Sequence, residues 1–214
     1  MISIVSDTPE LQAAEEKVRF LIRELSHRSR NLIAVIQAIA GQTARSTSSL
    51  PEFQQNFSRR LQGIAASHDL LVKGGWSGVS LADLIAKQLV PFCDKGQLEL
   101  DGPDVVLSPE VVQSIGLALH ELVTNAAKFG ALSEPAGKLH VFWKIETDEG
   151  QGYITLNWQE KGGPRVVPRT ESGFGIFVVG QMLESGLNGR VFFDFAPEGL
   201  IWTLRFPEKH LVHP

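Results

Sequence analysis

An apolar repeat at the start of the chain is the feature that most constrains its fold. Every seventh residue is apolar at Leu11, Val18, Leu25, Leu32 and Ile39, and Ala14, Leu21 and Val35 fill a second position of the same seam. This spacing is typical of a helix that packs along its length against other helices. Thr8 suits a helix cap and Pro9 the first helical position. We therefore predict one long helix that runs to about residue 44.

A second amphipathic segment follows the first. Residues 45–51, RSTSSLP, are rich in turn formers and predict a loop before a helix over residues 52–73. The apolar stripe of this second helix consists of Phe57, Leu61, Ile64, His68 and Leu71. Two helices alone bury too little surface, so we expect a helical hairpin that pairs with a second copy in a dimeric four-helix bundle. Within the stripe, His68 fits a hydrogen-bonded core residue better than a chemical group.

Polar residues interrupt the first helix at residues 24–31, ELSHRSRN. His27 lies two residues past Leu25 and off the apolar seam, so its imidazole is expected to face water, within reach of another domain. Arg28 occupies a seam position, and Arg30 follows it. These two arginines could steer phosphate or an acidic partner, or they could be solvated charge, and the sequence favours neither interpretation.

A glycine-rich boundary at residues 73–78, KGGWSG, separates this helical part from a mixed part. Hydrophobic patterning after it predicts helices and short strands. The expected helices cover residues 80–90, 109–129 and 175–184, and the expected strands cover 97–100, 104–107, 138–146, 152–158, 189–195 and 200–206. We predict an α+β protein with a helical domain at 8–73 and an α/β-sandwich at 79–208, whose mixed or mostly antiparallel sheet has helices on one face.

Residues 120–130, HELVTNAAKFG, place Glu121, Asn125 and Lys128 in one row of a helix, at the spacing i, i+4, i+7. The apolar stripe of this helix occupies another arc and consists of Val112, Ile115, Leu119, Leu122, Val123 and Ala126. A carboxylate, an amide oxygen and a lysine form a coherent set around a metal-bound nucleotide. The spacing fits a solvated helix face equally well.

Two glycine-bearing turns follow, at residues 158–164, WQEKGGP, and 172–175, SGFG. Glycine lets a backbone approach a ligand and offer its amides to phosphate. Glu160, expected directly after a strand, could accept a hydrogen bond from an exocyclic amine such as that of adenine. Each turn alone is more often an ordinary connection, but their order after the helical row makes the combination more specific.

Charge and composition exclude several classes of protein. The net charge of −4 and the pI near 5.9 give no general attraction to nucleic acid or to an anionic membrane. Cys93 is the only cysteine, so no internal disulfide can form, which fits a reducing compartment. Neither a membrane-spanning run nor a signal peptide is recognisable. We expect a cytoplasmic protein with no nucleic-acid or membrane partner.

Together these segments resemble the HWE group of bacterial sensor histidine kinases. ELSHRSRNLIAVIQAIA is similar to the phosphoacceptor box of this group, ALHELVTNAAKFGALS to its N box, WQEKGGP to its first glycine box and GFGIFVV to its second. The residues that name the group map to His120, Trp158 and Glu160. The resemblance implies a dimerisation and histidine-phosphotransfer hairpin followed by a GHKL-type (Bergerat) ATP-binding domain.

The resemblance also implies roles for individual residues. His27 would be autophosphorylated from Mg-ATP and would pass the phosphoryl group to an aspartate of a response regulator. Glu121 would orient or deprotonate the acceptor, Asn125 would hold Mg²⁺ against the phosphates, and Lys128 would contact phosphate. Glu160 would read adenine, and His120 and Trp158 would support the pocket. Gly163, Gly173 and Gly175 would shape the pocket and its lid.

Two departures from the family pattern qualify this interpretation. Only the eight residues 165–172 lie between the first glycine turn and Gly173, which predicts a short lid over ATP. About 20 residues precede the phosphoacceptor box, so we expect either a kinase core cut from a longer chain with a sensor domain or a separate upstream sensor protein. A non-catalytic histidine phosphotransferase with a decayed ATP domain and a GHKL-type ATPase clamp remain alternatives.

Overall fold

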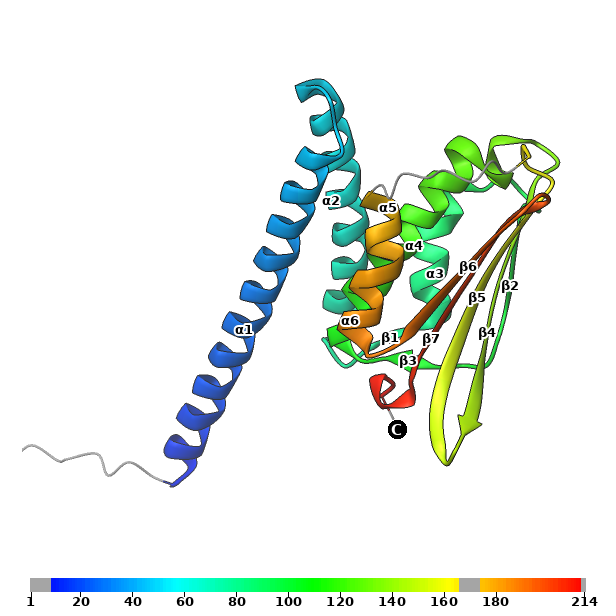
Figure 1. Ribbon diagram of the computed structural model, residues 1–214. Helices are drawn as coiled ribbons and strands as arrows, with labels where there is room; N and C mark the ends of the chain where they lie inside the picture. Colours follow the sequence, from blue (N-terminus) through cyan, green and yellow to red (C-terminus); the bar gives the residue numbers. More distant parts are fainter. Residues whose placement is uncertain (1–8, 166–173, 213–214) are drawn as a thin grey trace, which may run out of the picture. The chain divides into compact units, whose positions relative to one another are not determined.

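The computed structural model describes residues 9–165 and 174–212 (Figure 1). The side chains of His27, Arg28 and several of their neighbours lie outside this description. The chain divides into two compact units, Met1–Thr47 and Ser48–Pro214, and each unit is described by itself. The predicted functional division at residues 73–78 stays a prediction.

The first unit is a single helix, α1 (Pro9–Arg45). Its extent agrees with the prediction from the apolar repeat. Val18, Ile22 and Ile33 on this helix are each more than half exposed, at 53%, 56% and 54%. Apolar side chains at helical spacing that remain exposed in one chain are typical of a helix that associates with others. The predicted hairpin and dimeric bundle stay predictions.

The second unit begins with α2 (Leu50–Lys73), which is capped by Ser49 and ends at Gly74. The helix starts two residues earlier than predicted, because Pro51 is accommodated in the first turn, where its missing amide proton is not needed. Its buried residues are Arg60, Gly63, Ile64, Ser67 and Leu71. This face contacts α3 (Leu81–Leu89) and α4 (Pro109–Phe129).

The buried face of α2 shares Ile64 and Leu71 with the predicted apolar stripe, but it is otherwise shifted towards Arg60, Gly63 and Ser67. His68 is half-buried and packs edge to face against Trp76, with ring centroids 5.4 Å apart, instead of lying in the core. The physical reason is that small residues such as Gly63 and Ser67 let α2 approach α4 closely. Side-chain size at the helix crossing thus outweighs the apolar periodicity.

A five-stranded sheet in the order β2-β4-β5-β7-β6 forms the other layer of this unit. The strands are β2 (Leu98–Asp101), β4 (Lys138–Asp148), β5 (Gln151–Lys161), β6 (Arg190–Ala196) and β7 (Gly199–Pro207). β2 pairs with β4 in parallel and the other neighbours are antiparallel, which confirms the predicted mixed sheet. The predicted strand at 104–107 shortens to β3 (Val106–Leu107), which pairs with β1 (Val79–Ser80) in a separate ribbon.

The core lies between one face of this sheet and the helices α3, α4 and the segment after Phe174 (Figure 1). The sheet contributes the buried side chains Leu139, Val141, Trp143, Ile154, Leu156, Trp158, Trp202, Leu204 and Phe206. Over three alternating positions in each of the three central strands, every second residue belongs to this set, as expected for strands with one covered face. The α/β-sandwich predicted from the alternation is confirmed.

Helix α4 is the centre of the sandwich. Its predicted apolar stripe is buried throughout, and so are almost all residues from Val111 to Thr124. The reason is that α2, α3 and the helical segment 174–187 pack around α4, with the sheet as the adjacent layer (Figure 1). The prediction of a polar edge along this helix is therefore wrong at Glu121, which is buried, and holds only for Asn125 and Lys128, which are exposed.

The helix predicted at residues 175–184 is present but irregular. It consists of α5 (Phe174–Phe177), a π-helical turn η3 (Val178–Met182) and α6 (Leu183–Leu187). The indole Nε1 of Trp202 donates a hydrogen bond of 2.9 Å to the carbonyl of Val179 in the middle of the π-helical turn. Short single-turn helices η1 (Val90–Phe92), η2 (Ala131–Ser133) and η4 (Glu208–His210) complete the fold. Among the described residues, no helix has the length and apolar character required to cross a bilayer.

Candidate functional site

Gly175, the last residue of the second glycine turn, lies against the row on α4. A Cβ atom added to Gly175 would come within 3.2 Å of the Asn125 Nδ2 atom and 3.7 Å of the Glu121 Oε2 atom. A larger side chain at this position would therefore fill the space beside the amide. Residues 166–173, which include Gly173 and most of the predicted lid, lie outside the described residues, as does the side chain of Phe174.

The first glycine turn lies at the C-terminal end of the same helix. A Cβ atom on Gly163 would come within 2.7 Å of the backbone nitrogen of Ala131, directly after α4. Glu160 Oε2 accepts a hydrogen bond of 2.9 Å from that same nitrogen. Gly175 and Gly163, which are distant from α4 in sequence, thus lie beside its last turns and just beyond its end, respectively.

Glu160 lies inside β5 and not after it, because the pairing of β5 with β4 continues to Lys161. Its side chain is 5% exposed, and its second oxygen, Oε1, accepts a hydrogen bond of 2.9 Å from the indole Nε1 of Trp158. Burial raises the pKa of this carboxyl, while the donors from Ala131 and Trp158 oppose the shift. Glu160 and Trp158 therefore tie the end of α4 to the sheet.

Glu121 forms a buried ion pair with a residue that the sequence analysis missed. Arg60 on α2 donates from Nε to Glu121 Oε1 at 3.0 Å, and each side chain is only 9% exposed. Burial lowers the pKa of the Arg60 guanidinium, and the charge of Glu121 opposes that shift. The only local sign of this role in the sequence was that Arg60 lies three residues before Gly63, among the small residues of α2.

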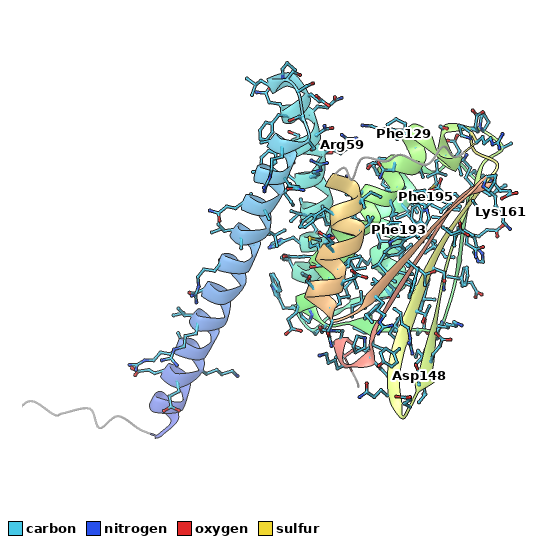
Figure 2. The ribbon with its side chains drawn as sticks, in the orientation of Figure 1. Arg59, Phe129, Asp148, Lys161, Phe193 and Phe195 are labelled. Atoms are coloured by element: carbon cyan, nitrogen blue, oxygen red, sulfur yellow. The ribbon has the colours of Figure 1, made fainter. Side chains whose placement is uncertain are left out.

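The end of α4 beside this ion pair is positively charged. A hollow of about 590 Å³ is lined by Gln54, Gln55, Ser58, Arg59, Gln62 and Lys128. Burial lowers the pKa of Lys128, the positive charges of Arg59 and Arg60 lower it further, and Glu121 opposes the shift. Three cations thus surround one carboxylate, an arrangement that favours an anion. Arg59 is labelled in Figure 2, as is Phe129 at the last position of α4.

His120 joins α4 to both neighbouring helices. Its Nδ1 atom lies 3.2 Å from Gln88 Oε1, and Gln88 Nε2 donates to the Gly63 carbonyl at 2.8 Å and to Ser67 Oγ at 2.9 Å. The edge of the ring meets Phe92, with centroids 5.6 Å apart. Burial, aided by the charge of Arg59, lowers the pKa of His120 from 6.5 to about 4. The imidazole is therefore neutral near pH 7 and acts in packing.

Comparison with known proteins agrees with this arrangement. The sequence profile of the family described as HWE histidine kinase matches residues 24–104. A blue-light-activated histidine kinase of Brucella ovis is 33% identical over 216 residues, an alignment that covers 100% of this chain and 44% of the relative. The chain carries an HWE histidine kinase domain. The equivalent proteins of Brucella abortus and Brucella anthropi have the same identity and coverage, so the chain spans less than half the length of these relatives.

Solved structures show the same fold. The histidine kinase domain of the Erythrobacter litoralis EL346 blue-light activated histidine kinase superposes with a TM-score of 0.56 at 19% identity, covering 83% of this chain and 84% of that one. A longer structure of the same kinase gives a TM-score of 0.51 at 17% identity, covering 83% and 62%. The HWE family prediction and the predicted fold class are confirmed.

The segment predicted to be the phosphoacceptor box lies in α1. His27 is helical, its side chain is outside the described part, and its predicted role stays a prediction. Within the described ranges, no group of three or more histidine, cysteine, aspartate or glutamate side chains could hold a metal ion by itself.

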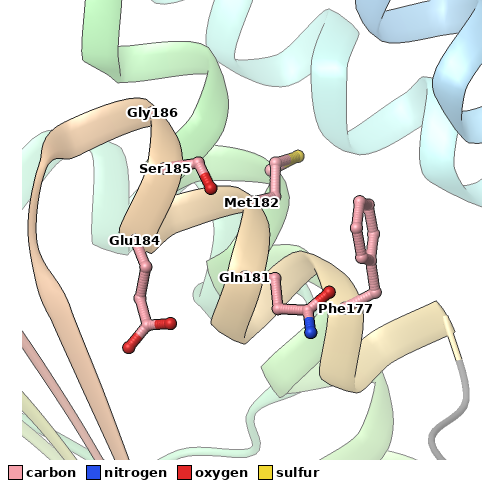
Figure 3. Close-up of a pocket in the computed structure, with 6 residues that line it drawn as sticks. All are labelled: Phe177, Gln181, Met182, Glu184, Ser185 and Gly186. Atoms are coloured by element: carbon pink, nitrogen blue, oxygen red, sulfur yellow. The ribbon is translucent and has the colours of Figure 1, made fainter.

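A second hollow, of about 560 Å³, lies on the surface over residues 177–186 (Figure 3). It is lined by Phe177, Gln181, Met182, Glu184, Ser185 and Gly186. All six belong to one continuous helical segment, and the Oε1 atom of Glu184 is already bonded to the backbone nitrogen of Val191 at 3.0 Å. This hollow offers no set of convergent polar groups, and the end of α4 is the better candidate site.

Proposed function

We propose that the chain is the core of a two-component signalling histidine kinase, which autophosphorylates on His27 with Mg-ATP and transfers the phosphoryl group to an aspartate of a response regulator. One observation carries this proposal. The segments similar to the N box and to both glycine boxes converge at the end of α4, where Gly175 faces Asn125 in the helix and Gly163 faces Ala131, two residues past it. Nothing in the folding of an ordinary sandwich requires three such segments to meet at one place.

The polar row supplies the phosphate end of the proposed site. Asn125 and Lys128 are exposed, so an amide oxygen is free to contact Mg²⁺ and an ammonium to contact phosphate oxygens. The magnesium ion would neutralise and orient the phosphates. Phosphoryl transfer depends mainly on positioning and charge neutralisation, and the excess of cations beside Lys128 suits it.

The proposed reaction has two transfers. A ring nitrogen of His27 uses its lone pair to form a bond to the γ-phosphorus, while the bond from that phosphorus to the bridging oxygen breaks and ADP leaves with the electron pair. Glu121 accepts a hydrogen bond from the other ring N–H of the acceptor. A receiver aspartate then attacks the same phosphorus, and the imidazole recovers its lone pair. A neutral imidazole near pH 7 is a competent nucleophile.

The adenine end of the proposed site lies at Glu160. Both oxygens of this carboxylate already accept hydrogen bonds, from Ala131 and from Trp158. A carboxylate oxygen has two lone-pair sites, so a contact to the exocyclic amine of adenine would use a second one. In this proposal, Trp158 and Ala131 hold Glu160 in place for that contact.

The assay for the proposal is incubation of the full chain with γ-labelled ATP and Mg²⁺. Acid-labile label should appear on the unaltered protein and be lost in His27→Ala and Asn125→Ala. The matched control is His140→Ala, since His140 stacks on Phe142 on the opposite face of the sheet from α4. No label from ATP, with transfer from a phosphorylated receiver to His27, would make the chain a phosphotransferase. ATP hydrolysis undiminished by His27→Ala would make it a clamp.

We also propose that the kinase acts as a homodimer through α1. The exposure of Val18, Ile22 and Ile33 supports this proposal. Sedimentation equilibrium of the unaltered chain and of a Val18→Glu/Ile22→Glu variant tests it: the variant should be a monomer where the parent is a dimer. The input signal would come from a sensor domain or from a separate sensor protein.

A further inference from the structure

We infer that Arg60 is a positioning residue for the proposed phosphoryl transfer, which holds the Glu121 carboxylate in orientation and ties that orientation to the place of α2. This inference rests on the proposed function. It gives a role in the site to a side chain of α2, the helix that follows the proposed phosphoacceptor helix in sequence. The site would then include α2 as well as the ATP-binding sandwich.

The two oxygens of Glu121 face different neighbours. Oε1 accepts the hydrogen bond from Arg60 Nε at 3.0 Å. Oε2 is the oxygen nearest the second glycine turn, 3.7 Å from the place of a Cβ atom on Gly175. One oxygen is therefore anchored by α2, and the other is directed towards the space beside Asn125. If the guanidinium were absent, the carboxylate could rotate and Oε2 would lose this direction.

Burial makes the anchor necessary. Both side chains of the ion pair are 9% exposed, and a buried carboxylate without a partner is strongly unfavourable. The guanidinium is planar, always charged and presents its donors in a fixed geometry, whereas a lysine ammonium is a mobile point charge. Arginine therefore fixes the orientation of the carboxylate as well as its charge.

Contacts along the α2–α4 interface determine where Arg60 lies. A Cβ atom on Gly63 would come within 2.6 Å of the His120 ring, so only glycine permits this approach. One turn further along α2, Ser67 packs against Gly116 of α4, where an added Cβ atom would meet the Ser67 Oγ atom, and Ser67 accepts a hydrogen bond from Gln88 of α3. These contacts hold α2 at one height on α4. A shift of α2 by one residue would carry Arg60 away from Glu121, so the position of α2 controls the orientation of the carboxylate.

The test compares Arg60→Met and Arg60→Lys with the matched control Arg190→Met, an exposed arginine on β6. The initial rate of His27 labelling is measured against Mg-ATP concentration, and ATP affinity is measured separately by displacement of a fluorescent ATP analogue. Arg60→Met should lower kcat by roughly tenfold to a hundredfold, with ATP affinity changed by less than about threefold. Arg60→Lys should recover part of the loss, and Arg190→Met should match the parent.

Several results would overturn the inference. An unchanged rate in Arg60→Met, or a rate and an ATP affinity that fall in parallel as in a purely structural role, contradicts it. If Arg60→Met does not fold, a double-mutant cycle of Arg60→Lys and Glu121→Gln is used instead. The rate of His27 labelling in the double variant should be no slower than in Glu121→Gln alone. Additive losses of rate would refute the coupling between Arg60 and Glu121. An unaltered protein that takes up no label refutes the proposed function and this inference with it. A labelled parent with equally active Arg60 variants refutes only the inference.

Discussion

Substitution of Gly63 by alanine tests the close approach of α2 to α4. The added Cβ atom would lie 2.6 Å from the Cγ atom of His120 and 2.9 Å from its Cβ atom. The imidazole has little room to move away, because Phe92 packs on its ring and Gln88 hydrogen-bonds to it. The helices must therefore separate or the ring must leave its place.

The magnitude follows from two opposing effects. Replacing a glycine by alanine inside a helix normally stabilises the helix by about 1 kcal/mol. Forcing an extra methyl group into a well-packed interface costs about 1–3 kcal/mol. With contacts well below the van der Waals distance on a confined ring, we expect the steric cost to prevail, with a net loss of about 1–2 kcal/mol and a fall in Tm of about 2–8 °C.

The assay is urea unfolding of the full chain followed by tryptophan fluorescence, since all four tryptophans lie after Ser48. Gly186→Ala is the matched control, because a Cβ atom on this helical glycine would meet no atom within 4 Å. The control should be as stable as the parent or more stable. If Gly63→Ala is stabilised like Gly186→Ala, the tight α2–α4 crossing is refuted.

Three further predictions concern the residues around α4. The pKa of His120 is lowered from 6.5 to about 4 in the folded chain, so between these values the unfolded chain binds a proton that the folded chain does not. Stability should fall as pH drops from 6.5 to 4, by up to roughly 3 kcal/mol. Urea titrations across this range should show a shallower fall in His120→Gln, and an identical slope would contradict the assignment. Trp158→Phe removes the donor to the buried oxygen of Glu160 and should lower the free energy of unfolding by about 1–3 kcal/mol; circular dichroism in urea measures the change, and full stability in the variant would show that the bond contributes nothing. Gly175→Val should weaken binding of a fluorescent ATP analogue by at least about tenfold, since its side chain would fill the space beside Asn125, while the unfolding midpoint stays close to that of the parent. Unchanged affinity in this variant would separate Gly175 from the nucleotide site.

Local sequence signals were sufficient for most elements of the fold. The seven-residue repeat gave the extent of α1, and the apolar stripe of α4 is buried as predicted. Both depend on periodicity within a single element, which a sequence displays directly. Alternation within the strands likewise predicted the sandwich, because one covered face requires every second residue to be apolar.

Features that depend on a distant partner were not predictable in this way. β5 continues through Glu160 because β4 pairs with it as far as Lys161, although the polar residues after Trp158 favoured an earlier end. The π-helical turn after Phe177 contains the Val179 carbonyl that bonds to Trp202, a residue of a later strand. No pattern within either segment predicts these contacts.

The candidate site likewise contains features that the sequence predicted and features that depend on a distant partner. The order of the motifs identified Asn125, Lys128 and Gly175 as neighbours, and Gly175 does face Asn125 in the structure. The sequence treated Glu121 as part of an exposed row, whereas it is buried against Arg60. That pairing depends on which face of α2 meets α4, and small residues on α2 determine the face more than its apolar stripe does.

The central proposal is that the nucleotide binds where the two glycine turns meet the end of α4. NMR titration of the isotopically labelled chain with a non-hydrolysable Mg-ATP analogue tests it most directly. We predict saturable shifts of the Asn125 side-chain amide and of the backbone amides of Gly175 and Ala131. The amides of Gly152 and Gly186, which lie away from this end of α4, should stay in place. Saturable binding that shifts Gly152 or Gly186 while Asn125 and Gly175 do not move would contradict it.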